Sequence, residues 1–303
     1  MLLINDEKDI ISKLLEIYPS EDFIIKKFSS GKTNILYHCT SPSNSLVLRI
    51  FGDTPFINRA EEMETITLLN SYSRCAPLIK KYTNGYISQY IIGRELEDSE
   101  LQLKYKNIIK EMKKWHKIKT GTPTIFTKLK DWYIRAYKHH RDFLEKNKIL
   151  EIIENKEKEI NKINFTSDDI GFCHNDLLAS NILINKEEII FIDYEYASIN
   201  YIHFDIANHL CEYAGYNCNF RLVPKHNFIK KVIKEYYGGA DRTFGKHLSS
   251  GFLEENINKL LFFIPLAHIL WGLWGLIKKK DRDFDYQKYG KIKILEAVRL
   301  MSE

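Results

Sequence analysis

The sequence predicts an α+β fold in two parts, in which an antiparallel β-sheet is followed by a longer, mostly helical region. Short apolar runs separated by turn residues fill residues 1–92 of the 303-residue chain. From residue 93 to residue 303, apolar residues mostly recur at helical spacing. A few short strands interrupt these helices after residue 170, and they flank a loop of polar residues. We therefore expect a small sheet domain over 1–92 and a helical domain over 93–303.

The first part is expected to begin with a helix that Asp6 caps and that runs through Tyr18. Asn84-Gly85 is a dipeptide typical of a hairpin turn, and it joins the last two of five predicted strands. The apolar face of the first helix comprises Ile10, Ile11, Leu14 and Leu15. The strands are expected over 23–28, 35–40, 45–50, 77–81 and 86–91, with a helix over 59–71.

The second part is expected to begin with an amphipathic helix over 99–116, and further helices follow it. Its apolar positions are Leu103, Ile108, Ile109, Met112 and Trp115. The other predicted helices span 132–143, 150–163 and 202–213, and strands are expected over 170–173, 182–184 and 189–192. Residues 260–277 carry no charge and reach the minimum length of about 18 residues for a membrane span. Pro265 and His268 within this run favour a buried core helix over a stable membrane span.

The polar loop after residue 173 contains the residues that most clearly indicate a function. His174-Asn175-Asp176 is followed, after four intervening residues, by Asn181, and Asp193 stands at the end of the next apolar strand. Protein kinases use this spacing for phosphoryl transfer, with H-R-D-x-x-x-x-N followed by D-F-G. Asn and Asp are also common in plain turns, but two linked halves in the right order favour a kinase-like site and a two-lobed, protein-kinase-like fold.

Phosphoryl transfer from ATP needs a carboxylate that orients and deprotonates the attacking hydroxyl group, and oxygen ligands for Mg²⁺. Asp176 suits the first role, and Asn181 and Asp193 suit the second. In the first part, the small-residue loop 29–34 could close over phosphates through its N–H groups. Arg49, near a strand end, could hold phosphates and pair with Glu61 or Glu62 of the following helix.

The sequence around the motif resembles the choline/ethanolamine kinase family, and within it ethanolamine kinases most closely. The resemblance rests on 172–181, on 191–197 and on Phe204 to His209, and it extends from about Phe28 to Tyr286. It implies an enzyme that uses MgATP to phosphorylate a small amino alcohol. It also implies that backbone groups of the stretch that begins at Gln89 bind the adenine. This family usually has a glycine where this chain has Ser30.

Motif and resemblance together give one set of expected site residues. The residues expected at the ATP are Ser30, Gly31, Lys32, Thr33, Asn34, Arg49, Gln89, Ile91 and Asp193. The residues expected at the amino alcohol are Asp176, Tyr196, Glu212, Trp271, Trp274 and Tyr286. The expected Mg²⁺ ligands are Asn181, Asp193 and Glu195, and the catalytic set is Asp176, Asn181 and Asp193.

The acceptor residues follow from the chemistry of a cation. Trp271 and Trp274 are three residues apart on one helix, so both can face one pocket, and aromatic faces attract ammonium groups. The alternative is that the tryptophans are core residues only. Glu212 is expected to provide the countercharge, whereas Asp205 is expected to brace the catalytic loop through hydrogen bonds to backbone N–H groups.

Composition limits the remaining possibilities. The net charge of +5 is mild and diffuse, which suits an anionic cosubstrate and gives no case for nucleic acid. The five cysteines show no metal-binding spacing, so reduced thiols in a cytoplasmic protein are expected. The sequence leaves open whether the chain forms a homodimer.

Several alternatives remain open from the sequence. Asp176-Leu177-Leu178 and Tyr213-Ala214-Gly215 favour ethanolamine as acceptor, with choline as the alternative, and either product would serve phospholipid biosynthesis, including that of phosphatidylethanolamine. An aminoglycoside phosphotransferase would share the fold but would need a broad acidic acceptor pocket. A pseudokinase that acts as a binding module would not be expected to retain Arg49 together with all three catalytic residues.

Overall fold

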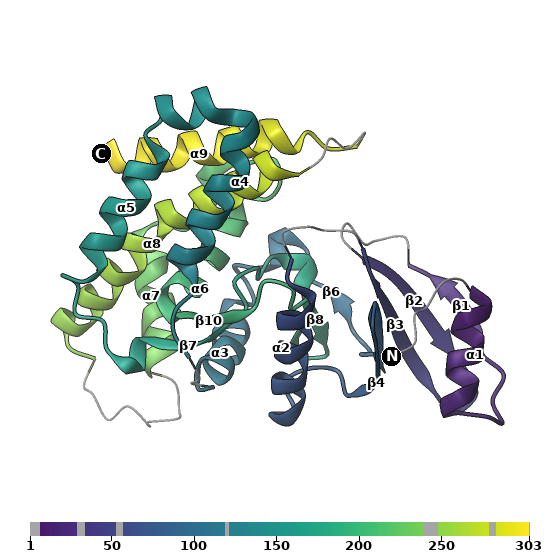
Figure 1. Ribbon diagram of the computed structural model, residues 1–303. Helices are drawn as coiled ribbons and strands as arrows, with labels where there is room; N and C mark the ends of the chain where they lie inside the picture. Colours follow the sequence, from purple (N-terminus) through teal and green to yellow (C-terminus); the bar gives the residue numbers. More distant parts are fainter. Residues whose placement is uncertain are drawn as a thin grey trace. The chain divides into compact units, whose positions relative to one another are not determined.

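The computed structural model describes residues 7–28, 34–52, 57–118, 121–238, 248–278 and 283–302. The chain forms two compact units, Met1–Arg94 and Glu95–Glu303. Figure 1 shows the first unit as a sheet with two helices and the second as a mostly helical body.

The first unit is a five-stranded antiparallel sheet in the order β1-β2-β3-β5-β4. Its strands are β1 (Ile24–Lys27), β2 (Asn34–Thr40), β3 (Ser45–Phe51), β4 (Leu78–Tyr82) and β5 (Gly85–Gln89). Its helices are α1 (Glu7–Ile17) and α2 (Arg59–Ser71). Asn58 caps α2 by accepting the N–H groups of Ala60 and Glu61 through its side chain, and α2 spans the residues that the sequence predicts.

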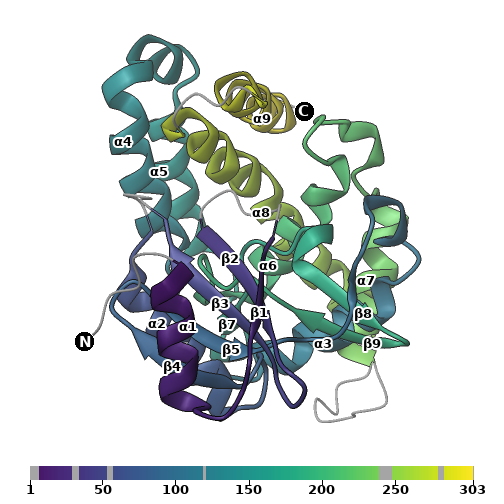
Figure 2. The ribbon, with the colours of Figure 1, turned by 90° about the vertical axis from the view of Figure 1, so that its right-hand side faces the viewer.

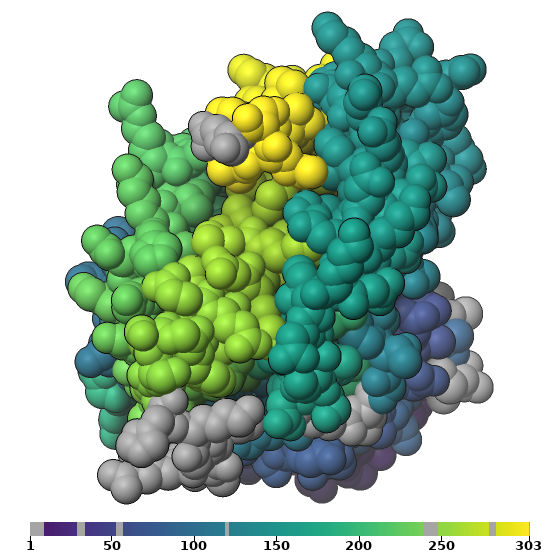
Figure 3. Space-filling view, turned by 90° about the vertical axis from the view of Figure 1, so that its left-hand side faces the viewer, coloured from purple at the N-terminus to yellow at the C-terminus, as the bar shows by residue number. Residues whose placement is uncertain are grey.

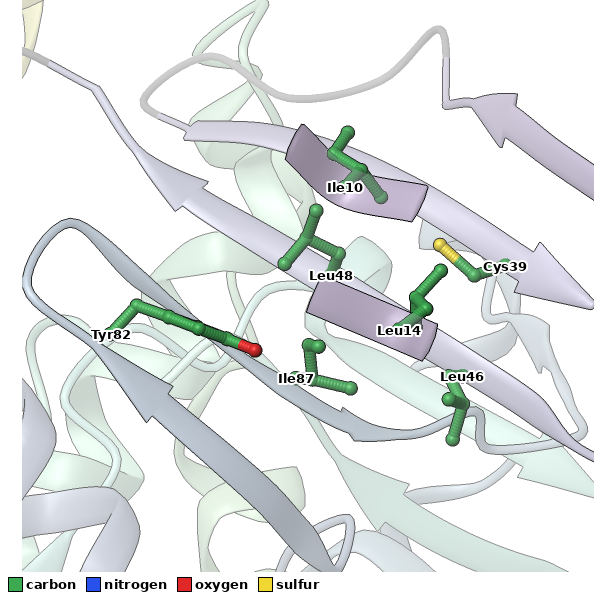
Figure 4. Close-up of a cluster of buried hydrophobic side chains, with 7 residues drawn as sticks. All are labelled: Ile10, Leu14, Cys39, Leu46, Leu48, Tyr82 and Ile87. Atoms are coloured by element: carbon green, nitrogen blue, oxygen red, sulfur yellow. The ribbon is translucent and has the colours of Figure 1, made fainter. Parts of the chain in front are cut away.

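The core of the first unit lies between α1 and the sheet. Ile10 and Leu14 of α1 are fully buried, and they pack with side chains of four strands, as Figure 4 shows. These side chains are Cys39, Leu46, Leu48, Tyr82 and Ile87. The predicted helix face was too wide, because Ile11 and Leu15 are 43% and 38% exposed. A helix that lies on a sheet buries only the stripe that points at the sheet, here the positions i and i+4.

The second unit contains two small sheets. The strands β7 (Ile170–Cys173) and β10 (Ser198–Tyr201) pair with each other antiparallel. The strands β8 (Ile182–Asn185) and β9 (Glu188–Phe191) form a hairpin, beside which lies the two-residue strand β6 (Arg94–Glu95). The helices are α3 (Tyr105–His116), α4 (Ile125–Lys146), α5 (Ile149–Ile160), α6 (Ile202–Cys211), α7 (His226–Gly238), α8 (Ser250–Ile277) and α9 (Tyr286–Ser302).

The predicted start of the first helix of this unit was wrong. The segment after residue 97 forms a 3₁₀ turn, Asp98–Glu100, and α3 begins only at Tyr105. Glu97 and Glu100 close this turn with a capping box, which satisfies backbone N–H groups without a longer helix. Leu103, expected to be an apolar helix position, is therefore 79% exposed, whereas the apolar positions within α3 are buried.

The helix α8 is the central element of the second unit. It packs against α4, α6, α7 and α9. On the face that Figure 3 shows, its yellow-green residues lie between teal residues of the α4–α5 region and green residues of the α7 region. It is the one described helix that is long and apolar enough to cross a membrane, but 89% of its most apolar window is buried in the protein. The structure thus agrees with the prediction of a buried core helix.

Three glycines bring α8 and α9 into close contact, and the two helices lie side by side in Figures 1 and 2. A Cβ atom on Gly272 would lie 2.5 Å from a side-chain atom of Ile294. A Cβ atom on Gly275 would lie 2.6 Å from the backbone oxygen of Tyr286, and one on Gly290 would lie 2.5 Å from that of Gly272. At Gly275 and Gly290 the nearest atoms belong to the backbone, so a larger residue there would require the backbone to move, and these glycines set how closely the two helices approach.

Candidate functional site

The polar loop of the motif joins β7 to β8. Two residues of the motif, Asn175 in this loop and Asp193 after β9, have left-handed backbone conformations. Their φ angles are 62° and 65°. Asn and Asp accept this conformation more readily than most residues, and it is enriched at functional positions. The chain therefore turns sharply just before Asp176 and again at Asp193.

Side chains of α6 hold the backbone of this loop. Asp205 accepts the N–H of His174 at 3.1 Å and that of Asn175 at 2.7 Å. Asn208 donates its Nδ2 to the carbonyl of Asn175 at 2.9 Å, and Nδ1 of His209 donates to the carbonyl of Leu177 at 2.7 Å. These contacts agree with the predicted bracing role of Asp205. They also reveal Asn208 and His209 as two further braces, which the sequence analysis missed.

A second layer of buried side chains holds Asp205 itself. Nε2 of His116 lies 2.9 Å from Oδ2 of Asp205, and Nδ1 of His116 lies 2.9 Å from the hydroxyl of Tyr236. Although burial raises the pKa of Asp205, the hydrogen bond and charge of His116, the charge of His174 and the hydrogen bond from the N–H of Asn175 together outweigh it, and the pKa lies below its ordinary value. Asp205 is therefore held as a carboxylate that accepts hydrogen bonds.

The loop is also tied to the strand that precedes Asp193. Nε2 of His174 donates to the carbonyl of Ile192 at 2.9 Å, and the N–H of Ile192 donates to the carbonyl of Asn181 at 3.0 Å. Nδ2 of Asn175 donates to the carbonyl of Tyr196 at 3.0 Å. The two halves of the motif are thus one hydrogen-bonded unit. The structural roles of the His174 and Asn175 side chains were missed, because their partners lie 18 and 21 residues further along the chain.

Asp176 lies buried in a concentration of negative charge. Burial raises its pKa well above the ordinary range, and the charges of Asp193, Glu212 and Glu195 raise it further. Asn181 opposes these effects with its Nδ2, which lies 2.8 Å from the carbonyl and 3.3 Å from Oδ2 of Asp176. The structure therefore brings Asp176, Asn181, Asp193 and Glu195 into one neighbourhood.

The donor set of this neighbourhood fits Mg²⁺. Because Nδ2 of Asn181 is committed to Asp176, its amide oxygen points elsewhere and remains an acceptor. Carboxylates of Asp193 and Glu195 add hard oxygen donors, which this ion prefers. The mutual repulsion that raises the pKa of Asp176 also shows that the site holds negative charge for a cation to compensate.

Aromatic side chains from three segments meet beside these carboxylates, and we call them the aromatic cluster: Tyr196, Trp271, Trp274, Tyr286 and Tyr289. Tyr196 and Trp271 meet edge to face with centroids 5.3 Å apart, and Trp274 meets Tyr286 in the same way at 5.3 Å. The cluster lies close to the carboxylates of the motif: burial raises the pKa of Tyr196, and the charges of Glu195 and Asp176 raise it further.

Both tryptophan N–H groups have defined partners. Nε1 of Trp271 donates to Oδ1 of Asn208 at 2.7 Å, and Nε1 of Trp274 donates to the hydroxyl of Tyr196 at 2.8 Å. Asn208 therefore links the catalytic loop to the aromatic cluster. Tyr289, as well as nearby Tyr216, was missed in the sequence analysis, although the predicted Tyr286 lies only one helical turn before Tyr289.

Glu212 follows α6 and already has a cationic partner. Nζ of the buried Lys293, from α9, lies 3.2 Å from its Oε1. Sequence analysis missed Lys293, which lies 81 positions away in a helix rich in exposed lysines. Glu212 also lies close enough to Asp176 for its charge to raise the pKa of that residue, while its Oε1 is engaged by Lys293.

The predicted nucleotide residues lie in the first unit. Arg49 of β3 pairs with Glu62 of α2 at 3.4 Å, which identifies Glu62 rather than Glu61 as its partner. Asn34 begins β2, and Gln89 ends β5, two residues before the predicted end of that strand at Ile91. The residues Ser30, Gly31, Lys32 and Thr33 lie outside the part of the chain that the structure describes.

Comparison with known proteins gives consistent matches. The family model described as choline/ethanolamine kinase matches residues 25–297. The chain is 30% identical to a probable ethanolamine kinase of Arabidopsis thaliana, over 88% of this chain and 76% of that protein. It is 29% identical to probable choline kinase 1 of the same plant, over 93% and 86%. The solved structure of a Plasmodium vivax ethanolamine kinase matches with a TM-score of 0.80 and 24% identity over 97% of this chain and 89% of that one, which supports the fold.

Proposed function

The chain belongs to the choline/ethanolamine kinase family and phosphorylates the hydroxyl group of ethanolamine or choline with ATP, and from this premise we propose how its residues carry out the reaction. The observation that carries the proposal is the proximity of Asp176 and Asp193. The two residues follow different strands, and the hydrogen bond from the N–H of Ile192 to the carbonyl of Asn181 joins their segments. A single phosphoryl transfer requires both residues at one terminal phosphate.

We assign Asp176 as the residue that receives the acceptor's hydroxyl proton while its oxygen attacks the γ-phosphoryl group. The new bond forms between this oxygen and phosphorus, the bond to the ADP oxygen breaks, and the products are ADP and phosphoethanolamine or phosphocholine. Its position supports this role, because Asp176 lies buried beside Asp193 and Glu195, and Nδ2 of Asn181 lies 3.3 Å from its Oδ2. The braces from α6 keep its backbone in place during the reaction.

Mg²⁺ would be held by Asn181 and Asp193, with Glu195 as a further ligand, and would offset the charge of the phosphates. Arg49, fixed by Glu62, is assigned to the phosphates of ATP. The remaining residues assigned to ATP are Ser30, Gly31, Lys32, Thr33, Asn34, Gln89 and Ile91.

The aromatic cluster and Glu212 are assigned to the ammonium group of the acceptor. Aromatic faces attract a buried cation, and a carboxylate accepts hydrogen bonds from a primary ammonium. We propose ethanolamine as the main acceptor and choline as the alternative main acceptor, with the product used for phospholipid headgroups. All five cysteines are free, which supports a cytoplasmic location.

A coupled assay of ADP release tests this function. Ethanolamine, choline and an aminoglycoside are compared at matched concentration, each with ATP and Mg²⁺. We expect turnover with both amino alcohols, higher kcat/KM for ethanolamine, and none with the aminoglycoside. Higher kcat/KM for choline would reverse the assigned preference, and turnover with the aminoglycoside alone would overturn the assignment of the acceptor site.

A further inference from the structure

The ion pair between Lys293 and Glu212 lies at the edge of the aromatic cluster. Lys293 is 0% exposed, and its Nζ lies 3.2 Å from Oε1 of Glu212 and 5.4 Å from the ring centroid of Tyr289. Tyr289 in turn meets Trp274 with centroids 6.3 Å apart. A lysine of the protein thus engages one carboxylate oxygen and one aromatic ring that a bound ammonium group would also use.

Glu212 is also tied by position to the other acceptor residues. It lies one helical turn after Asn208, which holds the indole N–H of Trp271. Burial raises the pKa of Tyr289 well above its ordinary value, and the charges of Glu212 and Asp176 both contribute to the rise. Glu212, Asp176 and the aromatic cluster therefore share one electrostatic neighbourhood, and Lys293 adds a fixed positive charge to it.

Lys293 acts differently on the two kinds of acceptor. Both carry one positive charge, so the long-range repulsion from Lys293 is similar for each. A primary ammonium also has three N–H donors, which need acceptor oxygens once water is removed. A trimethylated ammonium has no donor and is stabilised mainly by aromatic faces. Occupation of Oε1 by Lys293 therefore costs the primary ammonium a partner that the trimethylated group would not use.

We propose that Lys293 is a specificity-determining residue: by engaging Glu212, it weakens the site for a primary ammonium more than for a trimethylated one. This inference rests on the proposed role of Glu212 and the aromatic cluster in acceptor binding. Lys293 contacts neither ATP ligands nor the catalytic loop in any contact that the structure records for it, so it acts on the choice of acceptor rather than on the chemical step.

The test is the ratio of kcat/KM for ethanolamine to kcat/KM for choline, measured in the full chain. In Lys293→Met this ratio is expected to rise about tenfold, because a charged hydrogen-bond acceptor is released to the substrate. Lys291→Met, which changes an exposed lysine on the same helix, should leave the ratio unchanged. The double variant Glu212→Gln/Lys293→Met should lose the rise, since the released charge is absent.

The ratio separates specificity from general damage, because a loss of folded protein lowers both kcat/KM values by the same factor. An unchanged ratio in folded Lys293→Met overturns the inference. If Lys293→Met does not fold, Lys293→Leu, which also has no donor for Glu212, is measured instead, with a rise expected and an unchanged ratio overturning the inference. Turnover of neither amino alcohol by the unmodified chain would instead overturn the proposed function, an outcome distinct from active variants with an unchanged ratio.

Discussion

The carboxylate of Asp205 accepts a 2.7 Å hydrogen bond from the backbone N–H of Asn175, the residue directly before Asp176. The same carboxylate accepts the N–H of His174 and contacts Nε2 of His116. One buried acid, 30 residues after Asn175 in sequence, therefore fixes the backbone that carries the proposed base.

Asp205→Asn should lower kcat by about 10- to 100-fold, because an amide replaces one acceptor oxygen with a donor that faces another N–H group. The KM for ATP should change little, since no contact to ATP is assigned to Asp205. Steady-state kinetics and urea unfolding measure the two effects, and stability should fall by about 2–4 kcal/mol. A kcat within twofold of the unmodified chain would contradict the bracing role.

Asp176→Ala should lower kcat by about 10²- to 10⁴-fold, the usual contribution of a positioned proton acceptor. ATP binding should persist, because the assigned ATP ligands remain. Asp142→Ala, at an exposed position of α4, serves as the control and should retain full activity. Turnover by Asp176→Ala equal to that of the control would remove Asp176 from the mechanism.

Stability should fall as the pH drops from about 6.5 towards 4, because burial favours the neutral form of His203, His174 and His209 in the folded state. Burial lowers the pKa of His203 to about 4, and burial also lowers the pKa values of His174 and His209. The unfolded chain, with histidine pKa values near 6.5, binds protons first, so acid favours unfolding. For His203 this linkage amounts to roughly 3 kcal/mol across that pH window.

Urea unfolding between pH 7.5 and pH 4.5 measures this slope. His203→Gln should flatten it, because the variant removes a titrating group that contacts Asn256 at 3.0 Å. His226→Gln changes a largely exposed histidine and should leave the slope as it is. Equal slopes in the unmodified chain and His203→Gln would show that His203 does not titrate differently on unfolding.

Trp271→Phe keeps an aromatic face but loses the 2.7 Å hydrogen bond to Oδ1 of Asn208. The KM for the acceptor should rise about three- to tenfold, because the buried amide oxygen loses its partner, while the KM for ATP stays constant. Trp271→Ala should raise the acceptor KM much further, since the face itself is lost. Initial rates at varied acceptor concentration check both variants, and equal acceptor KM values in all three proteins would indicate a core role only.

The sequence predicted those features that depend on local pattern. The strands around the catalytic loop follow from short apolar runs, and the helix expected over 59–71 is α2; the structure contains both. The late start of α3 was missed because a capping box within 97–100 satisfied the backbone in another way. Element ends depend on such local competition between side chain and backbone.

The site was predictable only where its residues share a short motif. Asp176, Asn181 and Asp193 belong to one spacing, so the sequence indicates them directly. Asn208 and Lys293 gain their roles from partners 33 and 81 positions away, and neither has a sequence pattern that distinguishes it from its neighbours. Such long-range polar pairs are determined by how the helices pack, which single-sequence patterns do not encode.

The glycine contact between α8 and α9 also sets where Tyr286, Tyr289 and Lys293 lie relative to the tryptophans of α8. An added methyl group at Gly275 or Gly290 would meet backbone atoms of the other helix, push the helices apart and so displace all three side chains. A change in acceptor size could therefore arise from a single substitution at the crossing, with every aromatic residue retained. The dimensions of the proposed cation site therefore depend on residues that have no side chain.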